Sequence, residues 1–239
     1  MGAAKLGIPS LRADMLSDIV PETTWHRYGR FDAAKTFFLF RAGRFDHRGI
    51  GGTLGFYCDD FRLEGVWTRR AAWTADFVRQ AWAGLVCPDF SLWRDAPYPE
   101  QLWNVYRSRV LALAWQDAGL RIAPNLSFGA PQSYKFCFQG IPCGAPVVFC
   151  QARTVRVADR KLFLRGLRAG VRALEPQRIV FYGQAKWLSD EELPIGPVYS
   201  RLPAAIDGMR KVGFGRGAAD TWAETAGRAQ VAAAEQHGR

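Results

Sequence analysis

The feature that most constrains the fold is an apolar segment ending in proline and a polar residue, which occurs twice in the chain. Gly84 to Cys87 is followed by Pro-Asp, and Leu120 to Ala123 is followed by Pro-Asn. Because proline cannot donate to a β-ladder, strand pairing ends there, and Asp89 or Asn125 follows at the carboxyl end of the strand. Proteins of the α/β class place their chemistry at this end. The alternative is that Asp89 only caps a turn.

Apolar runs and helical periodicity extend this pattern along the chain. Strands are expected at 53–58, 84–87, 120–123, 145–150 and 178–182, and helices at 70–83, 100–118 and 159–173. Residues 37–40 are expected to form a short buried strand or an apolar plug. The alternation predicts an α/β fold with a mainly parallel sheet and crossover helices, either doubly wound or an incomplete TIM-like barrel. We expect residues 1–52 to form an N-terminal arm and basic loop, 53–212 an α/β core domain, and 213–239 a Gly/Ala-rich tail.

Net charge indicates the kind of partner, and cysteine usage indicates the cellular compartment. The net charge is +10, largely from arginine, which favours an anionic partner such as DNA or another polyanion. None of the five cysteines forms a C-x-x-C pair, so we expect reduced thiols in a cytoplasmic protein. No apolar run approaches about 18 residues and no signal-peptide core is visible, so neither membrane insertion nor export is expected.

Polar side chains are predicted to share one edge of the sheet. They are Asp59, Asp60, Asp89, Ser91, Asn125, Ser127, Gln151 and Tyr182. Carboxylate, amide and hydroxyl oxygens suit a hard ion such as Mg²⁺, and we expect Asp59, Asp60 and Asp89 to be its ligands. Paired acids could also perform acid/base chemistry.

The predicted helix 100–118 carries three polar residues, Asn104, Arg107 and Arg109, within its apolar pattern. An unpaired buried charge costs several kcal/mol, so an arginine there needs water or a partner. We expect Arg107 or Arg109 to contact one of four acids: Asp59, Asp60, Glu64 or Asp89. Such a pair would either lock the helix to the sheet or hold a carboxylate ionised for metal or substrate.

A basic run surrounds the predicted helix 159–173. Its members are Arg153, Arg156, Arg160, Lys161, Arg165, Arg168 and Arg172. Two interpretations stay open: a solvated helix face, or a surface that binds the phosphates of nucleic acid.

Several short motifs carry a resemblance to a known family. They are C-D-D-F-R-L-E from Cys58, P-D-F-S from Pro88, W-N-V-Y-R-S-R from Trp103, F-C-F-Q-G-I from Phe136 and F-Y-G from Phe181. In this order they resemble a family of uncharacterised proteins of bacterial genomes, phages and plasmids, described as a domain of unknown function. The resemblance implies a mobile-element context and transfers no activity.

The resemblance also singles out candidate site residues. The positions that match its recurring motifs are Asp60, Glu64, Asp89, Ser91, Asn104, Arg107 and Arg109. With Asp59 and Asn125 they form the candidate catalytic set.

Three functional hypotheses follow. The first is a mobile-element protein that binds or processes nucleic acid, with a replication-associated role and a metal at the carboxylate cluster. The second is an enzyme acting on a small phosphorylated or nucleoside-like substrate. The third is a non-catalytic interaction protein whose acids are structural. A salt-dependent DNA gel shift separates the first from the others, and Mg²⁺ calorimetry separates the third.

Overall fold

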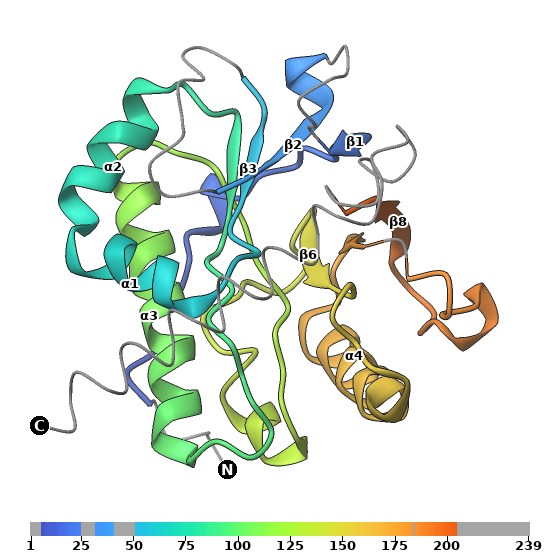
Figure 1. Cartoon of the computed structure of the whole chain (residues 1–239). Coiled ribbons are helices and arrows are strands. Elements are labelled where there is room, and N and C mark those ends of the chain that lie inside the picture. Colours follow the sequence, from blue (N-terminus) through green and yellow to red (C-terminus); the bar gives the residue numbers. More distant parts are fainter. Residues whose placement is uncertain (1–5, 25–31, 41–50, 184, 205–239) are drawn as a thin grey trace, which may run out of the picture. The chain divides into compact units, whose positions relative to one another are not determined.

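The computed structural model describes residues 6–24, 32–40, 51–183 and 185–204. Its strands are β1 (Thr23–Thr24), β2 (Thr36–Leu39), β3 (Thr53–Gly55), β4 (Gly84–Val86), β5 (Ile122–Ala123), β6 (Val148–Gln151), β7 (Arg178–Tyr182) and β8 (Val198–Leu202). Its α-helices are α1 (Asp60–Thr68), α2 (Arg70–Arg79), α3 (Tyr98–Asp117) and α4 (Arg160–Leu174). Figure 1 shows these elements along the chain.

All described strand pairs are parallel, which confirms the predicted α/β class. One sheet has the order β1-β2-β3-β4-β5 and the other the order β6-β7-β8. A parallel bridge between Asn125 and Phe149 links the end of β5 to β6. A doubly wound sheet reverses its strand order at a switch point. The described strands instead follow one another in sequence order.

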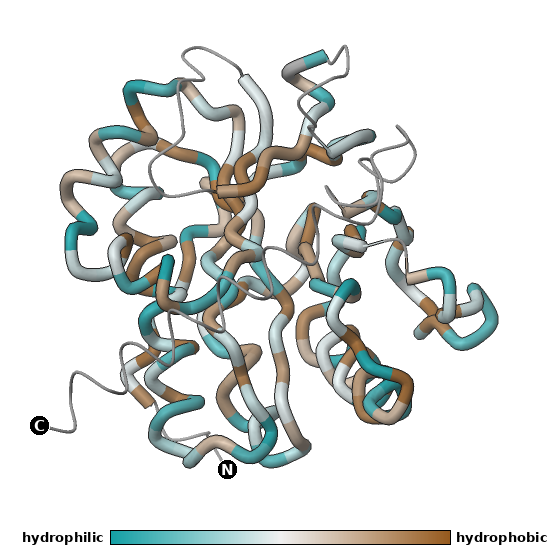
Figure 2. Tube along the Cα trace, viewed as in Figure 1, coloured by the Kyte–Doolittle hydropathy of each residue, from teal (hydrophilic) through white to brown (hydrophobic). Residues whose placement is uncertain are grey.

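Two apolar cores stabilise this arrangement. The first lies among the strands of both sheets and includes Phe37, Tyr57, Phe149 and Tyr182, with Phe37 and Phe149 stacked at 5.5 Å between ring centroids. The second contains the buried faces of the helices, with Trp115 of α3 at its centre. Figure 2 shows hydrophobic residues concentrated on the strands and alternating with hydrophilic residues on α4. This alternation is what a helix with one buried face requires.

The structure differs from the sequence prediction in three respects. β1 and β2 pair with the sheet, so the sheet begins before the predicted boundary at residue 53. The helix α1 was not predicted, because only Leu63 and Val66 of its nine residues are buried and its apolar pattern is weak. The strand β8 was also missed. The predicted tail 213–239 and most of the basic loop at 41–52 lie outside the described residues.

Two further expectations concern the thiols and the membrane. All five cysteines are free, as the absence of C-x-x-C pairs predicts. Within the described ranges, none of the helices combines the length and the hydrophobicity needed to span a bilayer.

Two glycines let α4 pack closely against the segment that follows β5. A Cβ atom on Gly166 would lie 2.1 Å from the Phe128 ring, and one on Gly170 would lie 2.7 Å from the Leu126 side chain. These distances are below van der Waals contact, so any side chain larger than hydrogen must displace its neighbour. Ser127 lies between these two neighbours, and the packing of α4 therefore helps to set its position.

We predict that Gly166→Ala destabilises the protein by about 1–3 kcal/mol, because the added methyl group overlaps Phe128. Urea unfolding measures this change. The control is Gly65→Ala in α1, where the nearest atom to the new Cβ is 3.5 Å away, so that variant should be neutral or slightly more stable. Equal effects of the two substitutions would contradict the packing argument.

Candidate functional site

The carboxylate of Asp89 lies at the carboxyl ends of three strands. Its Oδ1 accepts hydrogen bonds from Asn125 Nδ2 at 2.7 Å and from Ser127 Oγ at 2.6 Å. Its Oδ2 accepts one from Gln151 Nε2 at 3.0 Å. These donors follow β5 or end β6, while Asp89 follows β4. The repeated strand-Pro-polar ending therefore brings Asp89 and Asn125 together as the sequence predicts, and Asp89 stays partly exposed.

A second set of hydrogen bonds fixes the side-chain amides that face Asp89. The Tyr57 hydroxyl donates to Asn125 Oδ1 at 2.8 Å, which leaves the amide nitrogen of Asn125 directed at Asp89. The Thr154 hydroxyl donates to Gln151 Oε1, which orients Gln151 in the same way. The Tyr57 ring stacks on Tyr182 with ring centroids 4.8 Å apart. Both amides are thus held as donors to one carboxyl group.

The protonation equilibrium of Asp89 is shifted towards the acid form. Burial raises the pKa of this carboxyl to about 6, and the nearby charge of Asp60 raises it further, against the opposing effect of the Ser127 and Asn125 hydrogen bonds. No lysine or arginine of the described residues forms an ion pair with Asp89. A carboxyl group with this pKa exchanges its proton close to neutral pH.

Asp60 anchors the loop that follows Asp89. Its carboxylate accepts hydrogen bonds from the Ser91 backbone N–H, at 3.1 and 3.2 Å, and from Ser91 Oγ at 3.1 Å. Asn104 Nδ2 of α3 donates to the Ser91 carbonyl at 2.8 Å. Burial raises the pKa of Asp60 as well. Asp60, Ser91 and Asn104 therefore position the P-D-F-S segment from two sides.

The prediction that an arginine of the long helix contacts an acid is confirmed for Arg107. Its Nη1 donates to Glu64 Oε1, and its Nη2 donates to Asn104 Oδ1 at 2.5 Å. The guanidinium also lies 4.1 Å from the centroid of the Phe90 ring. This arrangement joins α3 to α1 through a charge-assisted hydrogen bond.

Arg109 takes a different role. It is buried, and its guanidinium donates to the carbonyls of Gln139 and Cys137, each at 3.2 Å. It contacts none of the four acids named for it, because it projects from α3 in a direction different from that of Arg107. Arg109 therefore fastens the 137–139 segment to α3.

The three-carboxylate metal site is not assembled in the described part of the chain. The Asp59 side chain is 74% exposed and pairs with Arg62 at 3.7 Å. Asp60 and Asp89 already accept hydrogen bonds from Ser91 and from the Asn125, Ser127 and Gln151 side chains. No group of three histidine, cysteine, aspartate or glutamate side chains suited to a metal occurs among the described residues. That Asp59, Asp60 and Asp89 bind a metal together therefore stays a prediction.

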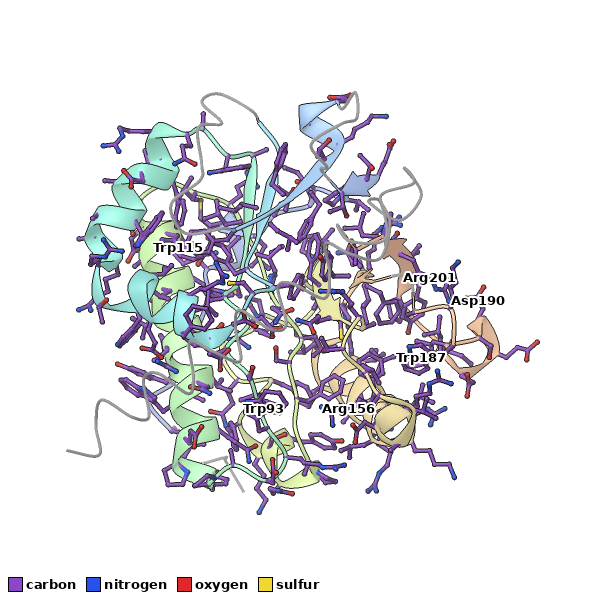
Figure 3. All side chains as sticks on the ribbon, in the orientation of Figure 1. Trp93, Trp115, Arg156, Trp187, Asp190 and Arg201 are labelled. Carbon is purple, nitrogen blue, oxygen red and sulfur yellow. The ribbon has the colours of Figure 1, made fainter. Side chains whose placement is uncertain are left out.

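The basic run is exposed, apart from one member. Six of its cations lie at the surface: Arg153, Arg156, Lys161, Arg165, Arg168 and Arg172. Arg160 is half-buried and packs on the Trp187 ring at 5.1 Å. Arg94 Nη1 donates to Asp159 Oδ1 at 2.6 Å, so the loop after β4 lies beside the start of α4 (Figure 3).

Sequence reasoning missed two residues of the Asp89 site, Tyr57 and Thr154. Tyr57 was assigned to a predicted strand. In the structure β3 ends at Gly55, and the hydroxyl of Tyr57, two residues later, donates to Asn125. Thr154 follows Gln151 by three residues, a spacing that allows a local side-chain hydrogen bond. Ser127 and Gln151 were expected at this edge, and the structure places both on Asp89.

Residues 18–200 match the family described as Domain of unknown function (DUF4417). The chain belongs to this family. It is 40% identical to the Gene 1 protein of Mycobacterium phage L5 over 146 residues, which are 60% of this chain and 62% of the relative. It is 36% identical to the Gene 1 protein of Mycobacterium phage D29 over 176 residues, which are 73% of this chain and 61% of the relative.

The chain thus spans about three fifths of the length of these two DUF4417 relatives. No solved structure matches it. The family match confirms the resemblance to a domain of unknown function, and both relatives are phage proteins.

The raised pKa of Asp89 predicts a pH-dependent contribution to stability. The folded protein holds this proton more tightly than the unfolded chain does, so the contribution of Asp89 to stability falls as the pH rises from about 4 to about 7. Asp89→Asn removes the titration. The free energy of unfolding of the variant should therefore rise by about 2 kcal/mol relative to that of the parent protein over that interval, measured by urea unfolding. A stability difference that stays constant with pH would contradict the assignment.

The Arg107 contacts predict a structural role that can be separated from that of Glu64. Arg107→Met leaves Asn104 Oδ1 without its donor and should cost about 2 kcal/mol in thermal or urea unfolding. Glu64→Gln removes the acid instead, and because this side chain is 48% exposed it should cost less than about 1 kcal/mol. Equal losses would show that the ion pair, and not the Asn104 contact, holds α3 in place.

Proposed function

We propose that this phage-related protein is an enzyme that acts on nucleic acid, with Asp89 as the group that exchanges a proton with the substrate. The observation that carries the proposal is a partly exposed carboxyl at the strand ends that is held by three neutral donors. Among the described residues, Asp89 neither forms an ion pair nor caps a helix, which are two common structural roles of an aspartate. Its environment matches that of a catalytic acid or base.

The surroundings of Asp89 support proton transfer in both directions. Ser127, Asn125 and Gln151 stabilise the ionised carboxylate, while burial favours the protonated form. The balance places the pKa near the working pH, where one group can accept a proton and return it. Substrate would reach Asp89 from the side on which the loops after β4 and β6 lie.

The exposed cations support a polyanionic substrate. Lys161, Arg165, Arg168 and Arg172 recur at intervals of three and four residues, so they lie along one face of α4. Arg153 and Arg156 precede that helix and continue the cationic surface towards Gln151. A row of cations suits the repeated phosphates of a nucleic acid better than a single phosphate group.

One observation favours the second hypothesis, a small phosphorylated substrate. A Cβ atom on Gly183 would lie 2.6 Å from the Cβ of Arg153, so Gly183 lets the Arg153 backbone sit tightly at the edge that carries Gln151. One well-positioned arginine there could bind one phosphate. Comparing mononucleotides with oligonucleotides as ligands separates the two substrates.

The proposal predicts a selective effect on nucleic-acid binding. Replacing Arg165 and Arg172 together by alanine should weaken the binding of a fluorescein-labelled oligonucleotide. It should also reduce the slope of log affinity against log salt by about 1.4, about 0.7 for each lost contact. Fluorescence anisotropy over a salt series measures both. The control removes the same charge elsewhere, by replacing Arg69 and Arg70 with alanine. Equal weakening by the two double variants would argue against a specific surface.

The enzymatic role of Asp89 is tested by a separate measurement. Oligonucleotides incubated with the parent protein are analysed by mass spectrometry for any change of mass, and Asp89→Asn is compared at equal occupancy. The expected result is binding retained and conversion lost. Conversion by the variant at the parent rate, or no conversion of any oligonucleotide by the parent protein, would overturn the enzymatic role.

A further inference from the structure

We infer that the nucleic acid this protein binds is single-stranded, and that Trp93 is the platform on which one of its bases stacks. This inference rests on the proposed function and specifies its substrate. It is drawn from an exposed tryptophan on the loop that follows the candidate acid, a loop that Arg94 joins to Asp159 at the start of α4.

Trp93 lies four residues after Asp89 on the loop that enters α3. Its side chain is 62% exposed, and it stacks on no other ring among the described residues. The next residue, Arg94, pairs with Asp159 at 2.6 Å, which holds this loop beside the segment that contains Arg156 (Figure 3). The exposed indole ring is accessible to a partner, and burying it against an aromatic ligand would lower the free energy of the complex.

The chemistry around Trp93 fits one class of partner. Arg153 and Arg156 are exposed on the neighbouring segment, and no ion pair neutralises them among the described residues. An aromatic face flanked by arginines combines base stacking with phosphate binding, as in proteins that bind single strands without sequence preference. A protein partner would not require this positive charge, and a membrane would require a larger apolar area.

The position of Asp89 argues for an unpaired strand. Its carboxyl group lies at the strand ends, under hydrogen bonds from Asn125, Ser127 and Gln151, and is only partly exposed. In a duplex the bases are stacked and paired, so their reactive atoms cannot approach a recessed carboxyl unless a nucleotide is flipped out. A single strand presents its bases without that cost, and Trp93 can replace the stacking partner that the base loses.

The test measures the affinity of the full chain for a labelled oligo-dT and for a duplex of matched length by fluorescence anisotropy. The expected result is tighter binding of the single strand. Trp93→Leu should weaken that binding about tenfold, Trp93→Phe should retain most of it, and neither should change duplex binding. The control is Trp103→Leu, which removes a tryptophan that is 45% exposed on α3 and stacked on Tyr106. Thermal unfolding confirms that each variant is folded.

The outcomes separate this inference from the proposed function. Equal affinities for single strand and duplex, or equal effects of Trp93→Leu and Trp103→Leu, would overturn the role of Trp93. The loss caused by the Arg165 and Arg172 double variant would still stand in that case. If no oligonucleotide binds at low salt, both the inference and the proposed function fail.

Discussion

The geometry of the Asp89 site depends on two hydrogen bonds from one helix to the backbone of one loop. Ser108 Oγ donates to the Pro88 carbonyl at 2.7 Å, and Asn104 Nδ2 donates to the Ser91 carbonyl at 2.8 Å. These carbonyls flank Asp89, and Pro88 has no N–H with which to continue the β-ladder. A buried carbonyl without a partner would cost about 1–3 kcal/mol, so α3 both satisfies the loop and fixes the direction of its acid.

The same helix, α3, directs its two arginines to partners other than Asp89. Arg107 pairs with Glu64 and lies against the Phe90 ring, so its guanidinium does not form an ion pair with Asp89. Arg109 is bound by the Gln139 and Cys137 carbonyls. Both arginines of the W-N-V-Y-R-S-R motif therefore hold the framework in place, and the acid keeps only neutral donors. A direct ion pair would have lowered the pKa of Asp89.

The sequence predicted those parts of the site that depend on local pattern. The strand-Pro-polar endings located Asp89 and Asn125. The polar interruptions of the long helix located Arg107 and Arg109 as residues that need a partner, because an unpaired buried charge is costly. Tyr57 could not be found in this way, since it lies beyond the end of β3 and its partner Asn125 is 68 residues away in the sequence. The different directions of two adjacent carboxylates were not predictable from the sequence either: at the start of α1, Asp59 turns to Arg62 while Asp60 turns to Ser91.

The pKa of Asp89 in the complex depends on which part of the proposed substrate lies nearest to its carboxyl group. A phosphate near Asp89 adds negative charge beside a carboxyl whose pKa is already raised to about 6, and like charge raises such a pKa further. Arg153 and Arg156 oppose this effect to the extent that they neutralise the phosphate. If the strand lies with its phosphates on α4 and a base on Trp93, the base, which is uncharged, is the part nearest to Asp89. The acid could then keep its pKa near neutrality in the complex, which general acid/base catalysis requires.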